Sequence, residues 1–337
     1  IYSYLCSSIK QNMRFLTIPV LLSLGCMLSC VSPEKEKKEI LTATLKGPSA
    51  MAMIKMIEEK PVLNARYNTV FEIKNEPNQV KALILKGTPD FAVVPTTMAA
   101  LLYNMGQDYI LAAIPVWGSL YLFGNDTTIR SWNDLKDKRI SLMSKGNTPD
   151  VLFRYLASAN GLDPEKDLQL DYSFPGHIEL ANAISSGISD LGVISEPMVS
   201  LVQQKNPMVK PLMDLNREWE KKFGDTIPFA QTALLVKKEF LAQHPEEVAE
   251  YLRKTEESVN WVNHFPNEAA SMIKKYDILP DSVLALNSIP RCNIKYASAE
   301  QEKSGIQEYL KVFYTFNPLI IGGKLPDEKF YYQKPAN

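Results

Sequence analysis

Short apolar runs alternate with amphipathic stretches over most of the chain. The run ILTATL at 40–45 predicts a buried strand, and the residues after a Lys-Gly turn predict a helix over 50–59. A helix over 79–86 that ends at Gly87 then leads to the apolar strand 91–95. Strands that alternate with helices are typical of parallel sheets, so we expect an α/β fold.

The same order of elements returns further along the chain. Strand 139–143 is followed by a second Lys-Gly turn and by a helix whose expected N-cap is Thr148. A helix over 178–186 then ends at Gly187, before the apolar strand 191–195. The sequence therefore contains two copies of one strand–turn–helix plan.

The spacing of marker glycines supports a true repeat. Gly47 and Gly87 are 40 residues apart, and Gly146 and Gly187 are 41 residues apart. The alternative is that any βαβ unit ends its helices with glycine and begins its strands with apolar residues. On the repeat interpretation we expect two similar α/β lobes with a ligand cleft between them, because open α/β sheets bind ligands beyond the carboxyl ends of their strands.

Two segments are candidates for crossing between the lobes. The segment 114–124 predicts a strand with a central glycine, and 228–236 predicts the return strand. We expect lobe I to comprise 40–117 and 233–337, and lobe II to comprise 118–232. Two crossovers would let the lobes close as hinged units. Further helices are predicted at 245–264, 267–275, 281–286 and 300–315.

The N-terminal region has the pattern of an export signal. Residues 15–33 carry no charge and follow a basic residue, as in the apolar region of a signal peptide. Small residues precede Cys30 and Cys26, and both sites resemble a loose bacterial lipobox. We expect 1–29 to be an upstream segment plus a lipoprotein signal peptide, with lipid attached to Cys30 and Cys26 as the alternative.

The charged stretch that follows supports this assignment. Residues 30–39 are rich in Lys and Glu, which suits a solvated tether between a lipid and a folded body. Met13 is a natural start, so 1–12 can be upstream sequence. The alternative is an uncleaved membrane anchor. On either interpretation the body lies in the periplasm or at the cell surface, bound to a bacterial membrane.

Composition narrows the classes of function. The chain has 337 residues, with 37 Lys+Arg against 38 Asp+Glu, so it lacks the positive charge of a nucleic-acid binder. Three of its four cysteines lie in the first thirty residues, and no Cys/His spacing matches a metal site. The Lys-Gly turns are too short for a P-loop. We therefore expect no metal, no cofactor and no nucleic-acid partner.

The two Lys-Gly turns are the first candidate binding loops. Each lies where a strand passes into a helix, and the unpaired N–H groups of a helix N-terminus favour an electron-rich ligand. Ser49 and Thr148 can cap these helices, donate to a ligand, or both.

Three further side chains are predicted at the edge of the cleft. Trp117 and Tyr121 can stack on a planar ligand or belong to the core. The carboxylate of Glu196 follows a lobe II strand, and it can accept from an amine or a ring N–H, or cap a helix.

Several segments together resemble a known family. They are Trp132-Asn-Asp-Leu-Lys-Asp-Lys-Arg-Ile140, Gly146-Asn-Thr-Pro-Asp150, Gly161-Leu-Asp-Pro-Glu-Lys-Asp167, Ser195-Glu-Pro197 and the Gly-Gly-Lys-Leu-Pro-Asp tail. Over about residues 40–332 the chain resembles periplasmic solute-binding proteins of ABC importers. It is most similar to the group that binds nitrate, sulfonates, taurine and thiamine-pyrimidine precursors.

The resemblance implies a type II periplasmic-binding fold, with two α/β lobes, two crossovers and the ligand in the cleft. It also implies a set of ligand-binding residues: Gly47, Pro48, Ser49, Thr96, Thr97, Trp117, Ser119, Gly146, Asn147, Thr148, Glu196 and Thr232. None of the implied loops contains an arginine, which is unlike a strong sulfonate binder and leaves room for neutral heteroaromatic ligands.

The resemblance also implies a function without bond chemistry. It predicts a lipid-anchored monomer that captures a small molecule by lobe closure and delivers it to an ABC permease and its ATPase. One alternative is an enzyme of vitamin-precursor metabolism on the same fold, which would need a titratable group in the cleft. Another is a sensor that presents its ligand to a membrane kinase.

Overall fold

A computed structural model describes residues 38–143, 145–224 and 227–334. The predicted signal segment 1–29, which contains Cys26, and the predicted lipidation site Cys30 lie outside the described residues. So do most residues of the predicted tether, but its last two, Lys38 and Glu39, already belong to strand β1.

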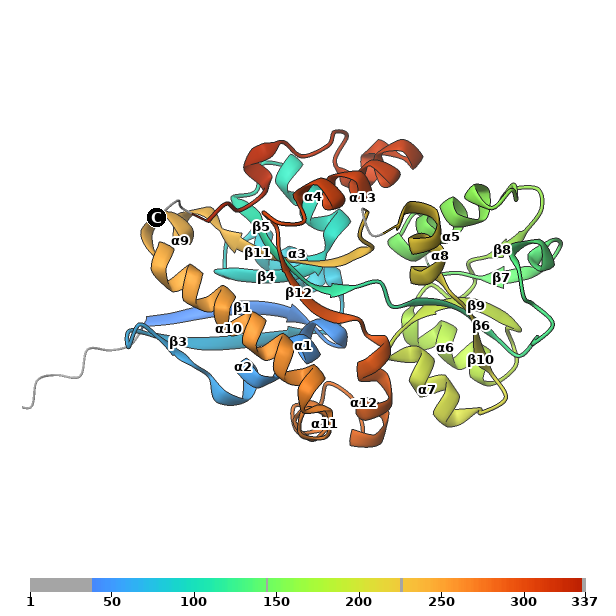
Figure 1. Cartoon of the computed structure of the whole chain (residues 1–337), viewed down its shortest axis with the longest axis horizontal. Helices are drawn as coiled ribbons and strands as arrows, with labels where there is room; N and C mark the ends of the chain where they lie inside the picture. Colours follow the sequence, from blue (N-terminus) through green and yellow to red (C-terminus); the bar gives the residue numbers. More distant parts are fainter. Residues whose placement is uncertain (1–37, 144, 225–226, 335–337) are drawn as a thin grey trace, which may run out of the picture. The chain divides into compact units, whose positions relative to one another are not determined.

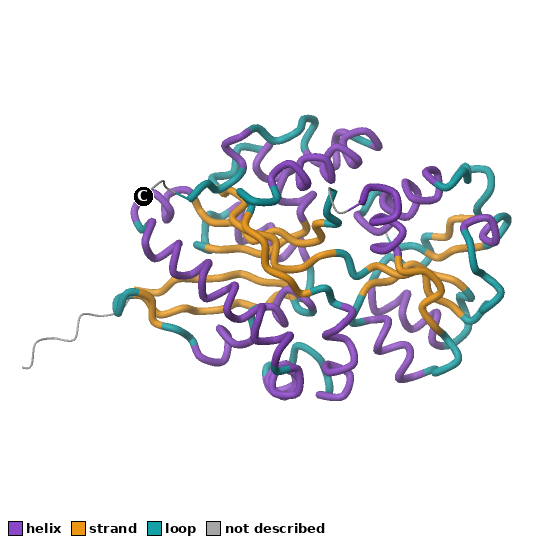
Figure 2. The backbone as a smooth tube through the Cα atoms, in the orientation of Figure 1, coloured by secondary structure: helices purple, strands orange, loops and turns teal. Residues whose placement is uncertain are grey.

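The strands form two separate sheets (Figures 1 and 2). We call the part built on the seven-stranded sheet lobe I, and the part built on the five-stranded sheet lobe II. The lobe I sheet has the order β12 (Ile294–Ser298), β5 (Tyr109–Trp117), β11 (Ala230–Lys237), β4 (Phe91–Pro95), β1 (Lys38–Leu45), β3 (Tyr67–Lys74), β2 (Val62–Leu63). The lobe II sheet has the order β10 (Lys210–Asp214), β6 (Leu120–Gly124), β9 (Leu191–Ser195), β7 (Arg139–Ser141), β8 (Gln169–Asp171).

The two sheets repeat one local topology. In lobe I, β1 pairs in parallel with β3 and β4, and β4 pairs antiparallel with β11. In lobe II, β7 pairs in parallel with β8 and β9, and β9 pairs antiparallel with β6. On its other side, β11 pairs antiparallel with β5 in lobe I, and β6 pairs antiparallel with β10 in lobe II. The predicted α/β fold with two similar lobes is confirmed.

Helices cover both faces of each sheet (Figure 1). In lobe I they are α1 (Pro48–Ala52), α2 (Ile54–Glu59), α3 (Pro77–Leu85), α4 (Thr96–Asn104), α9 (Lys238–Gln243), α10 (Pro245–His264), α11 (Pro266–Lys275), α12 (Ser282–Ser288) and α13 (Lys303–Phe316). In lobe II they are α5 (Thr148–Ala159), α6 (His177–Ser185), α7 (Met198–Lys205) and α8 (Leu215–Phe223). Short 3₁₀ helices are η1 (Trp132–Leu135), η3 (Ile289–Arg291), η4 (Pro318–Ile321) and η5 (Glu328–Phe330).

Apolar spacing explains how the longest helix docks. Most buried residues of α10 recur every three or four positions, which places them on one helical face: Glu247, Val248, Tyr251, Leu252, Thr255, Ser258, Val259 and Val262. The ring of Tyr251 stacks on Phe91 with 3.7 Å between ring centroids, and its hydroxyl lies 2.7 Å from Thr42 Oγ1. This face therefore covers the lobe I sheet with its polar atoms satisfied.

The marker glycines occupy equivalent places in the two lobes. Gly87 follows α3 with φ of +67°, and Gly187 follows α6 with φ of +76°. Both values lie in the left-handed region, where a helix commonly ends on glycine. The predicted helix ends are therefore confirmed to within two residues.

Some predicted elements differ from the structure. The helix expected over 50–59 is divided into α1 and α2 at Met53, whose ψ of 8° is not helical. Strand β3 has no counterpart among the predicted elements, although it pairs along its whole length with β1. Its alternating sequence YNTVFEIK is only half-buried over most positions, so it lacks the continuous apolar run of the other strands.

The crossing segment 114–124 consists of two strands. β5 ends at Trp117 in the lobe I sheet, and β6 starts at Leu120 in the lobe II sheet. The return strand β11 lies in the lobe I sheet from Ala230 onward, so the predicted lobe boundary at 232/233 falls inside β11. The chain thus passes between the sheets once at 118–119 and once before Ala230.

Candidate functional site

The first Lys-Gly turn lies where the two lobes meet. Gly47 is the N-cap of α1 with φ of 103° and ψ of −146°, a conformation open mainly to glycine. A Cβ atom on Gly47 would lie 3.6 Å from Cδ of Pro197, which belongs to lobe II. Pro48 begins the helix, and Ser49 is buried at the next position. The capping alternative for Ser49 is therefore wrong, because Gly47 holds the cap position and no side chain caps this helix.

The second Lys-Gly turn has the same role in lobe II. Gly146 has φ of +84°, Asn147 is the N-cap of α5, and Thr148 is the first helical residue. The prediction that Thr148 is the N-cap is wrong by one position, and no side chain caps the helix. Its hydroxyl oxygen instead lies 3.3 Å from Thr97 Oγ1 of lobe I.

A buried carboxylate fixes the shape of this turn. Asp150 is 1% exposed, and its Oδ2 accepts from the N–H of Gly146 at 2.7 Å. Its Oδ1 accepts from the hydroxyl of Tyr172 at 2.7 Å. Burial, together with this hydrogen bond, raises the pKa of Tyr172 to about 12, so the phenol remains a donor at neutral pH.

Two threonine hydroxyls at the lobe I edge are buried without a protein partner. Thr96 starts α4 directly after β4, and Thr232 lies opposite Pro95 in the β4–β11 ladder. Both Oγ1 atoms are inaccessible to solvent and have no hydrogen-bond partner among the described residues. A buried hydroxyl without a partner is unfavourable, so these two atoms could hydrogen-bond to a polar group that reaches them when the lobes separate.

The first crossover is tied to strand β11 at the end of the second crossing. The backbone N–H and the hydroxyl of Ser119, in the first crossover, both donate to Oε1 of Gln231, at 2.9 and 3.0 Å. The carbonyl of Ser119 accepts from the N–H of Glu196 at 3.1 Å. Ser119 therefore links both crossings to the lobe II loop that follows β9.

Trp117 is held by the backbone of its neighbour β12. Its indole N–H donates to the carbonyl of Lys295 at 2.7 Å, and the ring is half-buried. This bond orients the ring through its polar edge. Stacking of Trp117 on a ligand stays a prediction.

The carboxylate of Glu196 is buried and occupied by protein partners. Its side chain is fully buried and forms an ion pair with the guanidinium of Arg291. It also accepts from the N–H and the hydroxyl of Ser200, each at 3.1 Å. Burial raises the pKa of Glu196, while Arg291 opposes that rise. The acceptor capacity predicted for a ligand is therefore used within the protein.

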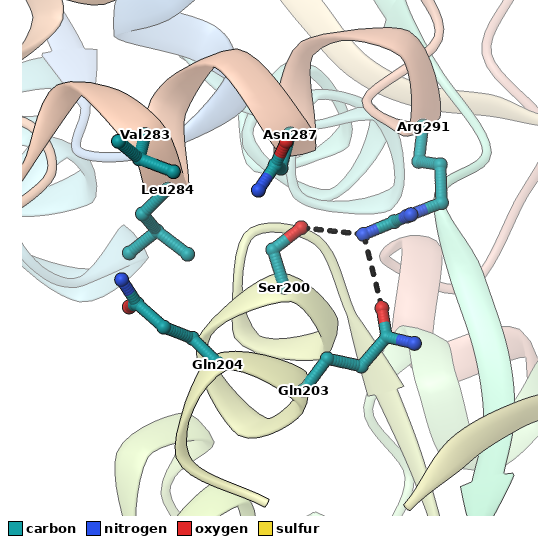
Figure 3. Close-up of a pocket in the computed structure, with 7 residues that line it drawn as sticks. All are labelled: Ser200, Gln203, Gln204, Val283, Leu284, Asn287 and Arg291. Atoms are coloured by element: carbon teal, nitrogen blue, oxygen red, sulfur yellow. Dashed lines mark hydrogen bonds between the residues drawn. The ribbon is translucent and has the colours of Figure 1, made fainter. Parts of the chain in front are cut away.

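Arg291, which no sequence motif points to, lies beside Glu196 at the junction of the lobes. It ends η3, which leads from α12 into β12 of lobe I, and its Nη2 donates to Ser200 Oγ at 2.6 Å and to Gln203 at 3.3 Å. It lies beside a cavity of about 330 Å³ between α7 of lobe II and α12 of lobe I (Figure 3). The cavity is lined by Ser200, Gln203, Gln204, Val283, Leu284, Asn287 and Arg291.

The described residues contain neither a candidate metal site nor a membrane-spanning helix. Among the parts of the chain that the structure describes, no group of three His, Cys, Asp or Glu side chains could hold a metal ion. In the same ranges, no helix is long and apolar enough to span a bilayer.

These features define a class of protein. Two α/β lobes with matched topology, joined by two crossovers and meeting through strand-to-helix turns, form the fold of periplasmic solute-binding proteins. A family described as "Menaquinone biosynthesis" matches residues 49–315, and the chain belongs to this family. The match covers both lobes.

Solved structures share this fold. An ABC transporter protein from Parabacteroides distasonis is 28% identical, with a TM-score of 0.78, over 89% of this chain and 100% of that one. The aliphatic sulphonate binding protein SsuA from Escherichia coli is 15% identical, with a TM-score of 0.67, over 84% of this chain and 94% of that one. The predicted similarity to ABC importer binding proteins is confirmed at the level of fold and family.

A curated relative matches over a shorter stretch. The "Putative binding protein YtlA" of Bacillus subtilis is 23% identical over 158 residues, which is 47% of this chain. The match covers 45% of that protein, so the chain spans just under half the length of this curated relative.

Proposed function

We propose that the protein is the extracytoplasmic substrate-binding component of an ABC importer. On this proposal it captures a small organic molecule or an oxyanion between its lobes, closes on it, and delivers it to a permease and its ATPase. The binding loops are the two Lys-Gly turns, the start of α4, and the segment around Thr232. The relative from Parabacteroides is named as an ABC transporter, which supports the transport role. SsuA is named as a sulphonate binder, which supports an oxyanion as one candidate ligand.

The observation that carries the proposal is the pair of buried, unpartnered hydroxyls of Thr96 and Thr232. They lie at the strand ends of lobe I, near the contact of Thr97 with Thr148 from lobe II. A ligand with acceptor or donor groups would satisfy them, and it would contact both lobes at once. Such a ligand stabilises the arrangement in which the lobes are together.

The charge of the site favours ligands held by hydrogen bonds. The one carboxylate of the predicted set, Glu196, is neutralised by Arg291. Lys46, which precedes the first turn, pairs with Asp277 at 3.1 Å. Hydroxyl groups and helix N-termini then supply most of the polarity, which suits nitrate-like or sulfonate-like oxyanions and also pyrimidine precursors.

A thermal-shift screen tests this proposal. The panel holds nitrate, alkanesulfonates, taurine, pyrimidines, flavins, amino-acid-like anions and intermediates of menaquinone biosynthesis. We expect one chemical class to raise the unfolding midpoint in proportion to the logarithm of its concentration, because the ligand binds only the folded chain.

A matched variant provides the control. Thr232→Val keeps the shape of the side chain and removes the hydroxyl, so it should weaken the hit by roughly 10-fold or more while leaving the unfolding midpoint of the free protein unchanged or higher. Thr128→Val, on an exposed loop of lobe II, should leave the affinity unchanged. If no class shifts the midpoint, or if Thr232→Val binds as well as the parent, the proposed site is wrong.

We also propose that the protein is anchored by lipid at Cys30, with Cys26 as the alternative. The motif and the Lys/Glu-rich stretch after it support this proposal. Mass spectrometry of the membrane fraction should find a diacylated peptide that begins at Cys30. A diacylated peptide that begins at Cys26 would select the alternative, and an intact N-terminus with both cysteines unmodified would contradict the proposal.

The second candidate is an enzyme of vitamin-precursor metabolism, which the description of the family favours. It would need a titratable group that a ligand can reach. The carboxylate of Glu196 is not available to a ligand in this arrangement, because it is buried and already bound by Arg291 and Ser200. Conversion of a ligand from the screen into a product, in more than the amount of protein present, would favour the enzyme over the binding protein.

A further inference from the structure

One ion pair joins the two lobes. Arg291 belongs to lobe I, and Glu196 follows β9 of lobe II. Among the ion pairs of the described residues, every other pair joins two groups within one lobe. Because Arg291 and Glu196 belong to different lobes, 95 positions apart in the sequence, their contact exists only while the lobes are together.

The two partners differ in their access to water. The side chain of Glu196 is 0% exposed, whereas that of Arg291 is 33% exposed. The reason is the cavity between α7 and α12, which Arg291 lines (Figure 3). Water in that cavity can hydrate the guanidinium, but the carboxylate depends on Arg291 and Ser200 for its polar contacts.

The ion pair between Arg291 and Glu196 is suited to fixing how the lobes are oriented, and less to raising the overall stability of the fold. We call this ion pair the clasp. A buried ion pair contributes little net stability, because desolvation of the charges offsets their attraction. Removal of one partner, however, leaves the other charge buried and uncompensated. The lobes also meet at Thr97 and Thr148, and at the rings of Trp219 and Tyr309, whose centroids are 5.7 Å apart. The clasp therefore acts together with these contacts to fix one relative orientation.

We propose that Arg291 is a positioning residue, which acts through Glu196 to hold the lobes together around the ligand cleft. Arg291 need not touch the ligand. The inference deepens the proposed function, on which it rests for the role of lobe closure in ligand capture. It also explains why the carboxylate of Glu196 faces the protein and not the cleft.

Because Glu196 is buried and Arg291 is partly exposed, removing Arg291 should open the lobes more than removing the charge of Glu196 does. Arg291→Met leaves Glu196 buried without its countercharge, so the lobes should open until water reaches the carboxylate. Glu196→Gln leaves Arg291 partly hydrated by the cavity, so its effect should be small. The double variant has no uncompensated charge at the clasp, so it should close far better than Arg291→Met. It still lacks the bonds of Arg291 to Ser200 and Gln203, so a small opening relative to the parent should remain.

Hydrogen exchange of the full chain, followed by mass spectrometry, measures this opening without a ligand. The backbone N–H groups of Thr97 and Thr148 lie in the first turns of α4 and α5, where helices provide no internal acceptor. Thr97 is 6% exposed and its hydroxyl oxygen lies 3.3 Å from that of Thr148 in the other lobe, so we expect exclusion of water by this contact to slow their exchange. In Arg291→Met, peptides that contain these amides should exchange at least about 10-fold faster. In Glu196→Gln the increase should stay under about 3-fold, and the double variant should return to the rate of the parent within about 3-fold.

Two other peptides control for unfolding. Strand β1 and the second half of α5 should exchange as in the parent in all variants. A faster rate confined to residues next to 196 and 291 would overturn the proposal and make the pair a local structural contact. Equal effects of the two single variants, or a double variant as open as Arg291→Met, would also overturn it. Because no ligand is used, these outcomes are independent of the ligand screen, and either proposal can fail alone.

Discussion

Replacing Gly118 with alanine is expected to lower the free energy of unfolding by roughly 3 kcal/mol, since the first crossover has no room for a side chain. A Cβ atom at this position would lie 1.5 Å from Cδ1 of Phe229, which is in the second crossover, and 2.6 Å from Oδ1 of Asn216. Phe229 is itself buried against Trp219, with 5.6 Å between ring centroids, and cannot move away freely. The two crossovers are packed directly on each other.

Urea denaturation measures this effect, with Gly176→Ala as the control. Gly176 has φ of −100° and only a flexible side chain near its Cβ position, so alanine there should change stability by less than about 1 kcal/mol. Phe229→Leu should partly rescue Gly118→Ala, giving a double variant more stable than the sum of the single changes. Equal free energies of unfolding for Gly118→Ala and Gly176→Ala would contradict the claim that the two crossovers pack directly on each other.

Replacing Asp150 with asparagine is expected to lower the free energy of unfolding by roughly 2 kcal/mol, because two charge-assisted hydrogen bonds are lost or weakened. One oxygen of asparagine can still accept, but its NH₂ group must face either the N–H of Gly146 or the hydroxyl of Tyr172. The contact with Gly146 that shapes the second Lys-Gly turn is then lost or weakened, because a neutral amide oxygen accepts less strongly than a carboxylate. The affinity for the screened ligand should fall as well.

Asp190→Asn is the matched control, since this carboxylate is exposed. Denaturant midpoints of the two variants should differ, with Asp190→Asn within about 0.5 kcal/mol of the parent. Tyr172→Phe should lower the free energy of unfolding by part of the amount that Asp150→Asn does. Adding it to Asp150→Asn should lower the free energy of unfolding little further. A stable Asp150→Asn with unchanged affinity would show that the turn does not depend on this carboxylate.

Local signals in the sequence predict much of the fold. Gly87 and Gly187 mark helix ends because a positive φ is needed there, and this requirement depends only on neighbouring residues. The apolar runs of β1, β4 and β9 likewise identify strands that are covered on both faces. The division of the chain into two lobes follows from repetition of these local signals.

Long-range contacts are the part that the sequence does not predict. Glu196 looks like a ligand group because it follows a strand at the cleft edge, but its partner Arg291 comes from the other lobe, 95 positions away. The only local sign is a charged residue inside an apolar segment, Ile289-Pro-Arg-Cys292, which ends in a buried thiol. Thr148 differs by one position from its predicted role, because Asn147 and not the threonine takes the cap position.

The central claim is that the chain binds its ligand and releases it unchanged. The most direct test is to mix the ligand found by the screen with the protein at about 100:1 and to follow the ligand by NMR over hours, since typical enzymes turn over about 1 to 1,000 times per second. We predict saturable binding of one ligand per chain, with the whole ligand recovered in its original chemical form. Conversion of the ligand to a product beyond the amount of protein present would contradict the account and make the protein an enzyme.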